Sequence, residues 1–355
     1  MESQKLKKLL IVRLSALGDT IHTIPLAVAL KKQYPDLIID WIVEDKASEF
    51  IINNPIINKF YEIPRRKWKN NKNKIANIKD FFSIIKLIRK EQYDAVIDVQ
   101  QLFKSGLIMG LSGAKRKITL DNGREFSYLF ANEIIYTGRK QFDINYHVVK
   151  RNMEFAKYLG CKNLDIEFKL PDFTKEINKN LKDIIYNIDR TKKTIVIAPA
   201  TTWTNKHWIS QKWSNVINSL IDKYNIIITA SEKEKNITSE ILLNTVQKDK
   251  IINLTGMTSL ADLVYIYNNV DMVISPDSGS THIAWACQNP YIITLFFATS
   301  KNRTAPFGDK YYALSPKIDC APCMKRKCYN KSNPLLCRNN INSEEIINIV
   351  KNVLQ

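Results

Sequence analysis

Three short segments place carboxylate, ammonium and hydroxyl groups directly after apolar runs, where such groups can act as a general base or bind a phosphate. In the first segment, VRLSALGDTIHTIP (12–25), a small-residue loop ends at Asp19. A carboxylate in this place can accept a proton from a substrate hydroxyl. Asp is also a good N-cap for the helix-like stretch that follows. A catalytic and a purely structural role for Asp19 therefore both stay open.

The second segment, APATTWTNKHW (198–208), offers groups that suit a phosphate. Thr201 and Thr202 supply hydroxyls, and Lys206 supplies a compact positive charge on a loop that leads into a helix. Phosphate oxygens are commonly bound by such donors. The alternative is an ordinary solvated loop with Trp208 packed beneath it.

The third segment, ISPDSGSTHIAWA (274–286), reads as a strand, a tight turn and a helix that starts near Ser280. Asp277, Ser278 and Gly279 form the turn. Glycine permits close backbone approach, and the free N–H groups of a helix start attract an anion. A diphosphate would fit there without a metal ion, whereas His282, one turn into the helix, also suits a buried core position.

A fourth segment, IPRRKWKNNKNK (63–74), gathers basic residues around Trp68. It contributes to a formal net charge of +18, which indicates either general Lys-rich composition or an anionic partner. A solvated loop, an anionic acceptor and a membrane surface are the open interpretations. No aromatic platform or RNA-binding motif accompanies the segment, so nucleic acid is not an expected partner.

The elements that must position these groups alternate between short β-branched runs and helix-length amphipathic stretches. Runs that are apolar on both faces and joined by helices predict parallel sheets covered on two sides, and the pattern occurs twice. Ligands of such sheets bind at the carboxyl ends of the strands, where the first three segments fall. The predicted strands are 9–14, 38–43, 59–63, 93–99, 117–120, 194–200, 225–230, 251–256, 271–276 and 291–296, with helices near 20–33, 77–91, 143–159 and 342–354.

A chain of 355 residues is too long for one ordinary core, so two domains are predicted, with a polar link near 170–180. No apolar run reaches the roughly 18 residues that a spanning helix needs. The N-terminal stretch lacks the shape of a signal peptide, because Arg13 interrupts its apolar run and no small-residue cleavage site follows. These features predict a cytoplasmic protein.

Taken together, VRLSALGDTIHTIP, ATTWTNKHW and SPDSGSTHIAWA resemble the signature blocks of family 9 glycosyltransferases, the lipopolysaccharide heptosyltransferases, with the closest fit to type I enzymes. The resemblance implies a GT-B fold: two Rossmann-like domains facing across a cleft, with the last helix returning to the first domain. It implies domains at 1–172 for the acceptor and 173–340 for the donor, and a helix at 341–355. It also implies metal-independent, inverting transfer of heptose from ADP-heptose to the Kdo-lipid A inner core, by an enzyme peripheral to the inner membrane.

The resemblance also assigns residues. Asp19 matches the general base of the family. The donor set that it implies has a diphosphate group, a sugar-binding acid with its adjoining turn, and nucleoside contacts: Thr201, Thr202, Lys206, Asp277, Ser278, Gly279, His282, Glu234 and Met257. The acceptor set that it implies would meet the phosphate and Kdo carboxylates of the lipid: Arg65, Arg66, Lys67, Lys104, Arg124, His147 and Arg151.

A cysteine cluster departs from the pattern of type I enzymes. Cys320, Cys323, Cys328 and Cys337 are spaced C-x2-C-x4-C-x8-C, and type II and related members carry similar clusters. Four thiolates at this spacing suit a structural zinc or iron ion, while reduced or disulfide-paired thiols are the alternative. The acceptor therefore stays open between type I, type II and protein-directed transfer. Outside the class, a nucleotide-sugar-binding or RNA-binding protein without catalysis would share the fold and charge.

Overall fold

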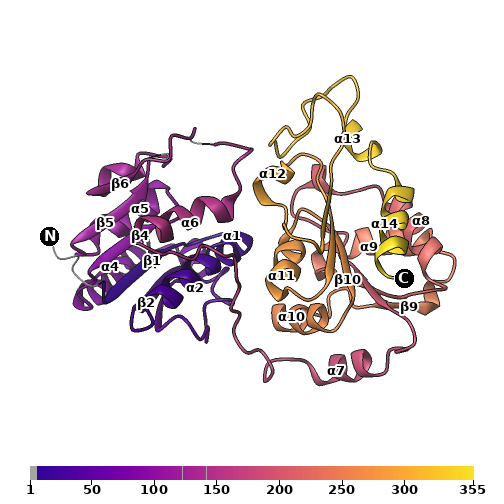
Figure 1. Cartoon of the computed structure of the whole chain (residues 1–355), viewed down its shortest axis with the longest axis horizontal. Coiled ribbons are helices and arrows are strands. Elements are labelled where there is room, and N and C mark those ends of the chain that lie inside the picture. Colours follow the sequence, from indigo (N-terminus) through magenta and orange to yellow (C-terminus); the bar gives the residue numbers. More distant parts are fainter. Residues whose placement is uncertain (1–5, 122, 141) are drawn as a thin grey trace. The chain divides into compact units, whose positions relative to one another are not determined.

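The computed structural model describes residues 6–121, 123–140 and 142–355. Contacts within the chain divide it into two compact units, with the division between Asp172 and Phe173. Figure 1 shows that each unit has a twisted parallel sheet with helices packed against it. The prediction of an α/β protein with two doubly wound parallel sheets is confirmed.

The sheet of the first unit has the strand order β3-β2-β1-β4-β5-β6, and every described pairing in it is parallel. Four residues of its central strand, Leu9 to Val12, are fully buried because they are apolar on both faces. The strands are β1 (Lys8–Val12), β2 (Ile38–Glu44), β3 (Lys59–Ile63), β4 (Ala95–Asp98), β5 (Arg116–Leu120) and β6 (Glu133–Ile135). The helices are α1 (Leu17–Ile21), α2 (Ile24–Gln33), α3 (Arg65–Asn70), α4 (Lys74–Lys90), α5 (Phe103–Leu111), the 3-10 turn η1 (Ser127–Phe130) and α6 (Val148–Tyr158).

The second unit repeats the plan with the order β12-β11-β10-β7-β8-β9. Its strands are β7 (Thr194–Ile197), β8 (Asn225–Ile228), β9 (Ile251–Asn253), β10 (Met272–Pro276), β11 (Tyr291–Leu295) and β12 (Tyr311–Leu314). Its helices are α7 (Lys179–Tyr186), α8 (Ser210–Leu220), α9 (Lys235–Leu243), α10 (Leu260–Asn268), α11 (Gly279–Cys287), α12 (Lys301–Thr304), α13 (Leu336–Asn339) and α14 (Ser343–Val353), with 3-10 turns η2 (Thr204–Lys206), η3 (Glu232–Glu234) and η4 (Lys248–Lys250).

Local structure departs from the prediction at a few places. The two strands that the sequence did not predict, β6 and β12, are short edge strands. The basic segment after β3 is the short helix α3 rather than a loop. Asp19 lies inside α1, and α11 starts at Gly279 rather than Ser280. These differences shift boundaries and leave the order of the predicted elements unchanged.

The last helix, α14, packs in the core of the second unit. The apolar face of α14, with Ile346, Ile347 and Val350, is completely or almost completely buried in the core of the second unit. That core also contains Trp213 and Ile217 of α8, and Ser343 donates a hydrogen bond to the backbone oxygen of Lys212 at 3.0 Å. The apolar face of α14 is thus buried within its own unit, and the expectation that the helix returns to the first domain stays a prediction.

None of the helices that the structure describes is long and apolar enough to cross a lipid bilayer.

Candidate active site

Asp19 is held by two neighbours in the first unit. Its Oδ2 accepts a hydrogen bond from the Ala16 N–H at 3.1 Å, which completes the N-terminal cap of α1. Its Oδ1 forms an ion pair with Arg13 Nη2 at 2.8 Å. The side chain is still 42% exposed. Asp19 therefore caps α1 from its third position, and Ala16 takes the N-cap position that the alternative predicted for Asp19. The Asp19 carboxylate is fixed in direction while a large part of it remains open to solvent.

A buried carboxylate that the sequence analysis did not single out supports this loop. Asp98 at the end of β4 accepts hydrogen bonds from the N–H groups of Gln100 and Gln101 at 3.1 and 2.8 Å. Gln100 Oε1 in turn accepts from the Leu14 N–H at 2.6 Å, next to the Asp19 loop. Burial raises the pKa of Asp98 to about 6, against the lowering effect of these hydrogen bonds. Asp98 thus orders the segment that fixes the exit of β1.

His147 lies against the Asp19 segment. The His22 and His147 rings meet edge to face with centroids 6.3 Å apart, and both side chains are buried. His147 Nδ1 accepts a hydrogen bond from the Val149 N–H at 3.2 Å and so caps α6. Asn152 of α6 donates to the backbone oxygen of His22 at 3.0 Å. The structure thus brings His147 to the loop of the predicted base, but in a buried capping position.

The other predicted acceptor residues are spread over several elements. Lys104 of α5 pairs with the buried Glu44 at 2.6 Å, and Lys67 of α3 pairs with Asp80 at 3.2 Å. The hydrogen bond from Lys67 lowers the pKa of Asp80. Arg65 and Arg66 are exposed on α3, Arg124 lies over the Phe142 ring at 5.8 Å, and Arg151 is half-buried on α6. Lys67 and Lys104 therefore already have carboxylate partners.

The second unit holds a buried ion pair at the carboxyl ends of its strands. Lys206 Nζ lies 3.1 Å from Asp277 Oδ2 and also donates to the Asp277 backbone oxygen. The Lys206 and Asp277 side chains are only 11% and 7% exposed. The pair joins the loop after β7 to the turn after β10, and these two strands are neighbours in the sheet. Two segments far apart in the sequence thus meet, as their places at the ends of parallel strands predict.

Asp277 is the centre of a larger network. Thr299 donates to its Oδ2 at 2.7 Å, Thr304 donates to its Oδ1 at 3.2 Å, and His282 Nε2 lies 3.7 Å from Oδ1. Burial disfavours the charged carboxyl, but Lys206, His282 and the Thr299 hydrogen bond outweigh it, so the pKa of Asp277 is below its ordinary value. Thr299 and Thr304 follow β11, and sequence reasoning missed them because no local motif marks them.

The turn after Asp277 leaves room for a ligand. A Cβ built on Gly279 would meet no atom within 4 Å. Ser278 is the N-cap of α11, and its hydroxyl, although buried, has no hydrogen-bond partner among the residues that the structure describes. The open space at the start of α11, beside the unpartnered Ser278 hydroxyl, can accept an anion. The phosphate-binding role of this turn stays a prediction, and the space at Gly279 leaves room for it.

The loop after β7 contributes further groups. Thr201 is buried, its backbone oxygen lies 2.5 Å from His207 Nε2, and Thr202 is exposed. Trp203 has Lys206 Nζ 5.2 Å from its ring centroid and the Arg326 guanidinium carbon 5.4 Å from it. Arg326 therefore joins the donor-site candidates. Arg326 lies in the cysteine segment, where no phosphate-binding pattern in the sequence marks it.

The two predicted nucleoside contacts have different surroundings. Glu234 Oε2 accepts hydrogen bonds from the Ser231 N–H at 3.0 Å and hydroxyl at 2.7 Å, so it closes a local cap in η3. Met257 follows β9 and is 58% exposed. Met257 is thus free to cover a flat apolar ligand, while Glu234 already has local partners.

The cysteine segment borders this site. Asn205 donates to the Lys325 backbone oxygen at 2.5 Å, and the Met324 N–H donates to the Ala298 oxygen at 2.7 Å. Asn205 and Ala298 also line a cavity together with all four clustered cysteines: Cys320, Cys323, Cys328 and Cys337. Burial, followed by the neighbouring thiols, raises the pKa of Cys337. The segment is therefore anchored on the two loops that hold Lys206 and Thr299.

The cysteines are unpaired in this structure. Among the residues that the structure describes, no three His, Cys, Asp or Glu side chains are arranged to hold a metal ion. The predicted zinc or iron site thus lacks the ligand geometry that a metal needs, although its four thiols share one cavity.

Sequence comparison assigns the chain to a family. The family described as glycosyltransferase family 9 (heptosyltransferase) matches residues 81–333. The lipopolysaccharide core heptosyltransferase OpsX of Haemophilus influenzae is 27% identical over 308 residues, which cover 85% of this chain and 82% of the relative. Lipopolysaccharide heptosyltransferase 1 of Campylobacter coli is 27% identical over 97% of this chain and 98% of its own length. Lipopolysaccharide heptosyltransferase 3 of Escherichia coli is 26% identical, with 79% and 81% covered.

Solved structures share the fold. A family 9 glycosyltransferase from Veillonella parvula superposes with a TM-score of 0.81 at 17% identity, over 98% of this chain and 97% of the other. The Escherichia coli heptosyltransferase WaaC with ADP-2-deoxy-2-fluoro heptose gives 0.70 at 22% identity, over 97% and 99%. The chain is thus an enzyme with a GT-B-like fold, and it belongs to glycosyltransferase family 9, the heptosyltransferases.

Proposed function

We propose that this enzyme transfers L-glycero-D-manno-heptose from ADP-heptose to the Kdo-lipid A inner core of lipopolysaccharide, with inversion at the anomeric carbon. The observation that carries the donor assignment is the Lys206–Asp277 pair beside the open helix start at Gly279. A buried ammonium and free N–H groups suit a diphosphate. The relatives named as lipopolysaccharide heptosyltransferases and the WaaC structure with a fluorinated ADP-heptose support the same donor and pathway.

In the proposed reaction Asp19 removes the proton from the acceptor hydroxyl as its oxygen attacks the anomeric carbon. The bond from that carbon to the diphosphate oxygen breaks, and ADP leaves with its negative charge. The ion pair with Arg13 holds the Asp19 carboxylate in one direction for this proton transfer. Lys206 and the N–H groups at the start of α11 stabilise the negative charge of the leaving diphosphate. In other transferases a divalent metal ion neutralises this charge.

The donor residues then take distinct roles. Ser278 and Gly279 face the diphosphate, Thr201 and Thr202 contribute to the same loop, and Met257 covers the adenine. Asp277 holds Lys206 in place, and it orients His282. Its oxygens already accept from Thr299 and Thr304, so Asp277 acts on the donor chiefly through Lys206.

The test of catalysis uses Asp19→Asn, with Asp165→Asn, an exposed Asp of the same unit, as control. Asn keeps the size of Asp19 but cannot take the proton, so turnover should fall by about 100-fold or more. Binding of ADP, measured by calorimetry, should not change. Full turnover in Asp19→Asn would refute the base assignment, and failure of the wild type to bind ADP would refute the donor assignment.

Acceptor choice needs a separate assay. Kdo-lipid A and mono-heptosylated Kdo-lipid A are offered side by side with ADP-heptose, and product is followed by mass spectrometry. Preference for Kdo-lipid A supports the type I function, and preference for the second acceptor gives the type II function. Transfer to a polypeptide alone would mean a protein-directed enzyme. ADP-heptose binding without any transfer would leave a non-catalytic nucleotide-sugar-binding protein.

A lipid acceptor also gives the enzyme a place of action at the inner face of the inner membrane, to which we propose it binds peripherally. The net charge of +18 supports this location, because the acceptor and the bilayer around it are both anionic.

A further inference from the structure

The helix α4 exposes an unusual number of large apolar side chains. Ile75, Ile78 and Phe82 are 68%, 55% and 55% exposed. Their spacing of three and four residues puts them in one stripe along the helix. Ile85 and Ile88, further along the same helix, are buried in the core of the first unit. The core of the first unit is thus packed without Ile75, Ile78 and Phe82, and these three apolar side chains stay exposed to solvent.

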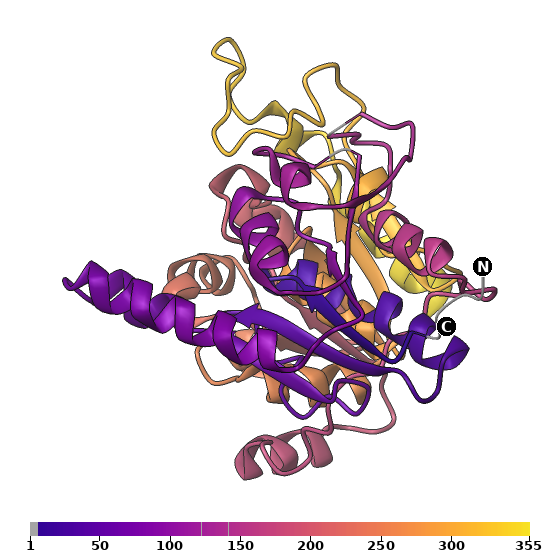
Figure 2. The same ribbon diagram turned by 90° about the vertical axis from the view of Figure 1, so that its left-hand side faces the viewer.

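Basic side chains accompany this stripe. Lys79, Lys86 and Arg89 fall on the same side of α4 as the stripe, because each lies three, four or seven residues from one of its members, and Lys90 lies four residues from Lys86. The only acid within α4, Asp80, accepts a hydrogen bond from Lys67 of the neighbouring α3. In Figure 2 the purple segment that contains α3 and α4 extends beyond the edge of the sheet of its unit. Positively charged side chains therefore surround the apolar stripe on α4.

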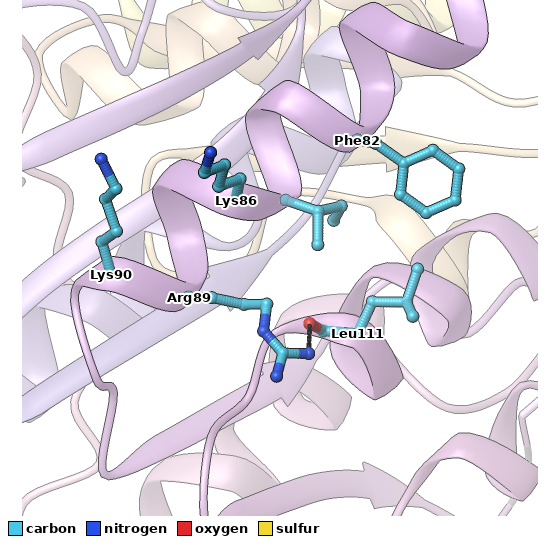
Figure 3. A pocket seen from close by; sticks show the side chains of 6 residues that line it. Phe82, Lys86, Arg89, Lys90 and Leu111 are labelled. Atoms are coloured by element: carbon cyan, nitrogen blue, oxygen red, sulfur yellow. Dashed lines mark hydrogen bonds between the residues drawn. The ribbon is translucent and has the colours of Figure 1, made fainter.

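A cavity on this surface combines both kinds of group. Figure 3 shows Phe82 and Leu111 beside the cavity and Lys86, Arg89 and Lys90 along the adjoining turns of α4. Arg89 donates to the Leu111 backbone oxygen at 3.4 Å, which holds the guanidinium at the edge of the cavity. Apolar walls with cations at the rim match a molecule that has an acyl chain and an anionic head.

We propose that the outer face of α4, together with this cavity, docks the enzyme on an anionic lipid bilayer. Ile75, Ile78 and Phe82 enter the boundary between headgroups and acyl chains, and Lys86, Arg89 and Lys90 contact lipid phosphates. A protein partner is the weaker alternative. Protein surfaces usually carry charges of both signs, whereas this face of α4 carries several cations, and its acid, Asp80, is already paired with Lys67. The proposal deepens the peripheral location in the proposed function and names the surface that provides it.

Vesicle co-sedimentation tests the proposal with the full chain. The wild type should bind vesicles of phosphatidylethanolamine and phosphatidylglycerol and bind vesicles of phosphatidylcholine at least about tenfold more weakly, because juxtamembrane cations respond to anionic lipid. The variant Ile75→Ser/Ile78→Ser/Phe82→Ser should lose about tenfold or more in affinity, since three inserted apolar groups are removed. The variant Lys86→Ser/Arg89→Ser/Lys90→Ser should lose the preference for anionic lipid.

The matched control is Leu243→Ser/Val246→Ser, which removes two side chains of the second unit that are 83% and 82% exposed. It should bind vesicles like the wild type. Equal binding by the wild type and both α4 variants would overturn the proposal, as would equal loss in the control. Turnover of a de-acylated, water-soluble acceptor should be the same in all variants. If no chain turns that acceptor over, the proposed function fails while the vesicle result still decides the docking surface.

Discussion

The buried Lys206–Asp277 pair makes the sharpest prediction about the second unit. Lys206→Met removes the ammonium but keeps most of the length and apolar volume of the side chain. It leaves the Asp277 carboxylate, whose side chain is 7% exposed, without its nearest cation. Breaking a buried pair in this way costs about 3–5 kcal/mol, because an uncompensated charge stays behind in the interior. We expect a loss of this size in the unfolding free energy of the second unit at pH 7.

The pH dependence separates this cause from a simple packing defect. In the wild type the pKa of Asp277 is lowered, so its contribution to stability is present above the unfolded pKa of about 3.9 and is lost as the pH falls through the lower folded value. In Lys206→Met the ammonium no longer offsets the burial of Asp277, which disfavours its charged form. The pKa of Asp277 in the folded state therefore rises above its value in the unfolded state. The carboxyl then takes up a proton more easily in the folded state, and the stability deficit should shrink as the pH falls from 7 towards 4.

Urea unfolding followed by tryptophan fluorescence gives the measurement, since Trp208 and Trp213 lie in the core of the second unit. The control is Lys250→Met, which breaks the exposed pair between Lys250 and Asp222 and should unfold like the wild type. The double variant Lys206→Met/Asp277→Asn should recover part of the loss because it removes both charges. A deficit below about 1 kcal/mol, or one that is constant between pH 7 and 4, would refute the account of a buried, compensated charge.

Four further outcomes follow from the described contacts. Gly279→Ala should leave the unfolding midpoint unchanged, because its Cβ meets no atom within 4 Å, but should weaken ADP binding in calorimetry; unchanged affinity would place the diphosphate elsewhere. Arg326→Gln should weaken binding of ADP but not of adenosine, with Lys327→Gln as the control, because Arg326 and Lys206 share the Trp203 ring; an equal loss for both ligands would contradict a phosphate contact. Asp98→Asn should remove a fall in stability of about 2 kcal/mol between pH 4 and pH 6, since the raised pKa of about 6 makes ionisation unfavourable in the fold; an unchanged pH profile would count against it. Elemental analysis of protein purified without added metal should find less than one zinc or iron per chain if the unpaired thiols do not form a metal site, and a full equivalent would restore the metal prediction.

The sheets could be predicted because their strands carry local signals. Runs such as TIVI in β7 and MVISP in β10 are apolar on both faces, and a parallel strand buried on two sides requires that pattern. The missed strands β6 and β12 are edge strands of three and four residues, in which too few side chains alternate to form a pattern. The placement of α14 was not predictable either, because an amphipathic helix specifies a buried face but not the partner that buries it.

The candidate site was predictable where a polar or charged residue directly follows a strand. Lys206 and Asp277 each follow a strand, and neighbouring parallel strands bring their loops together. Thr299 and Thr304 reach Asp277 only through the fold, so no spacing in the sequence connects them. Glu234 shows the opposite limit, because an acid three residues after Ser231 is as typical of a helix cap as of a ligand contact, and the cap is what the structure contains.

The excess of positive charge has more than one physical role, and the contacts separate the roles. Lys104 and Lys67 have carboxylate partners inside the first unit, so part of their charge serves local structure. Lys206 is buried and holds Asp277, at the site where we propose that the donor binds. The cations of α4 line an apolar surface that no core residue covers, and their natural counter-charge lies outside the chain. Raising the salt concentration should therefore weaken vesicle binding strongly and the buried Lys206–Asp277 pair little, because screening acts on exposed charges. Equal salt sensitivity of both would contradict this division.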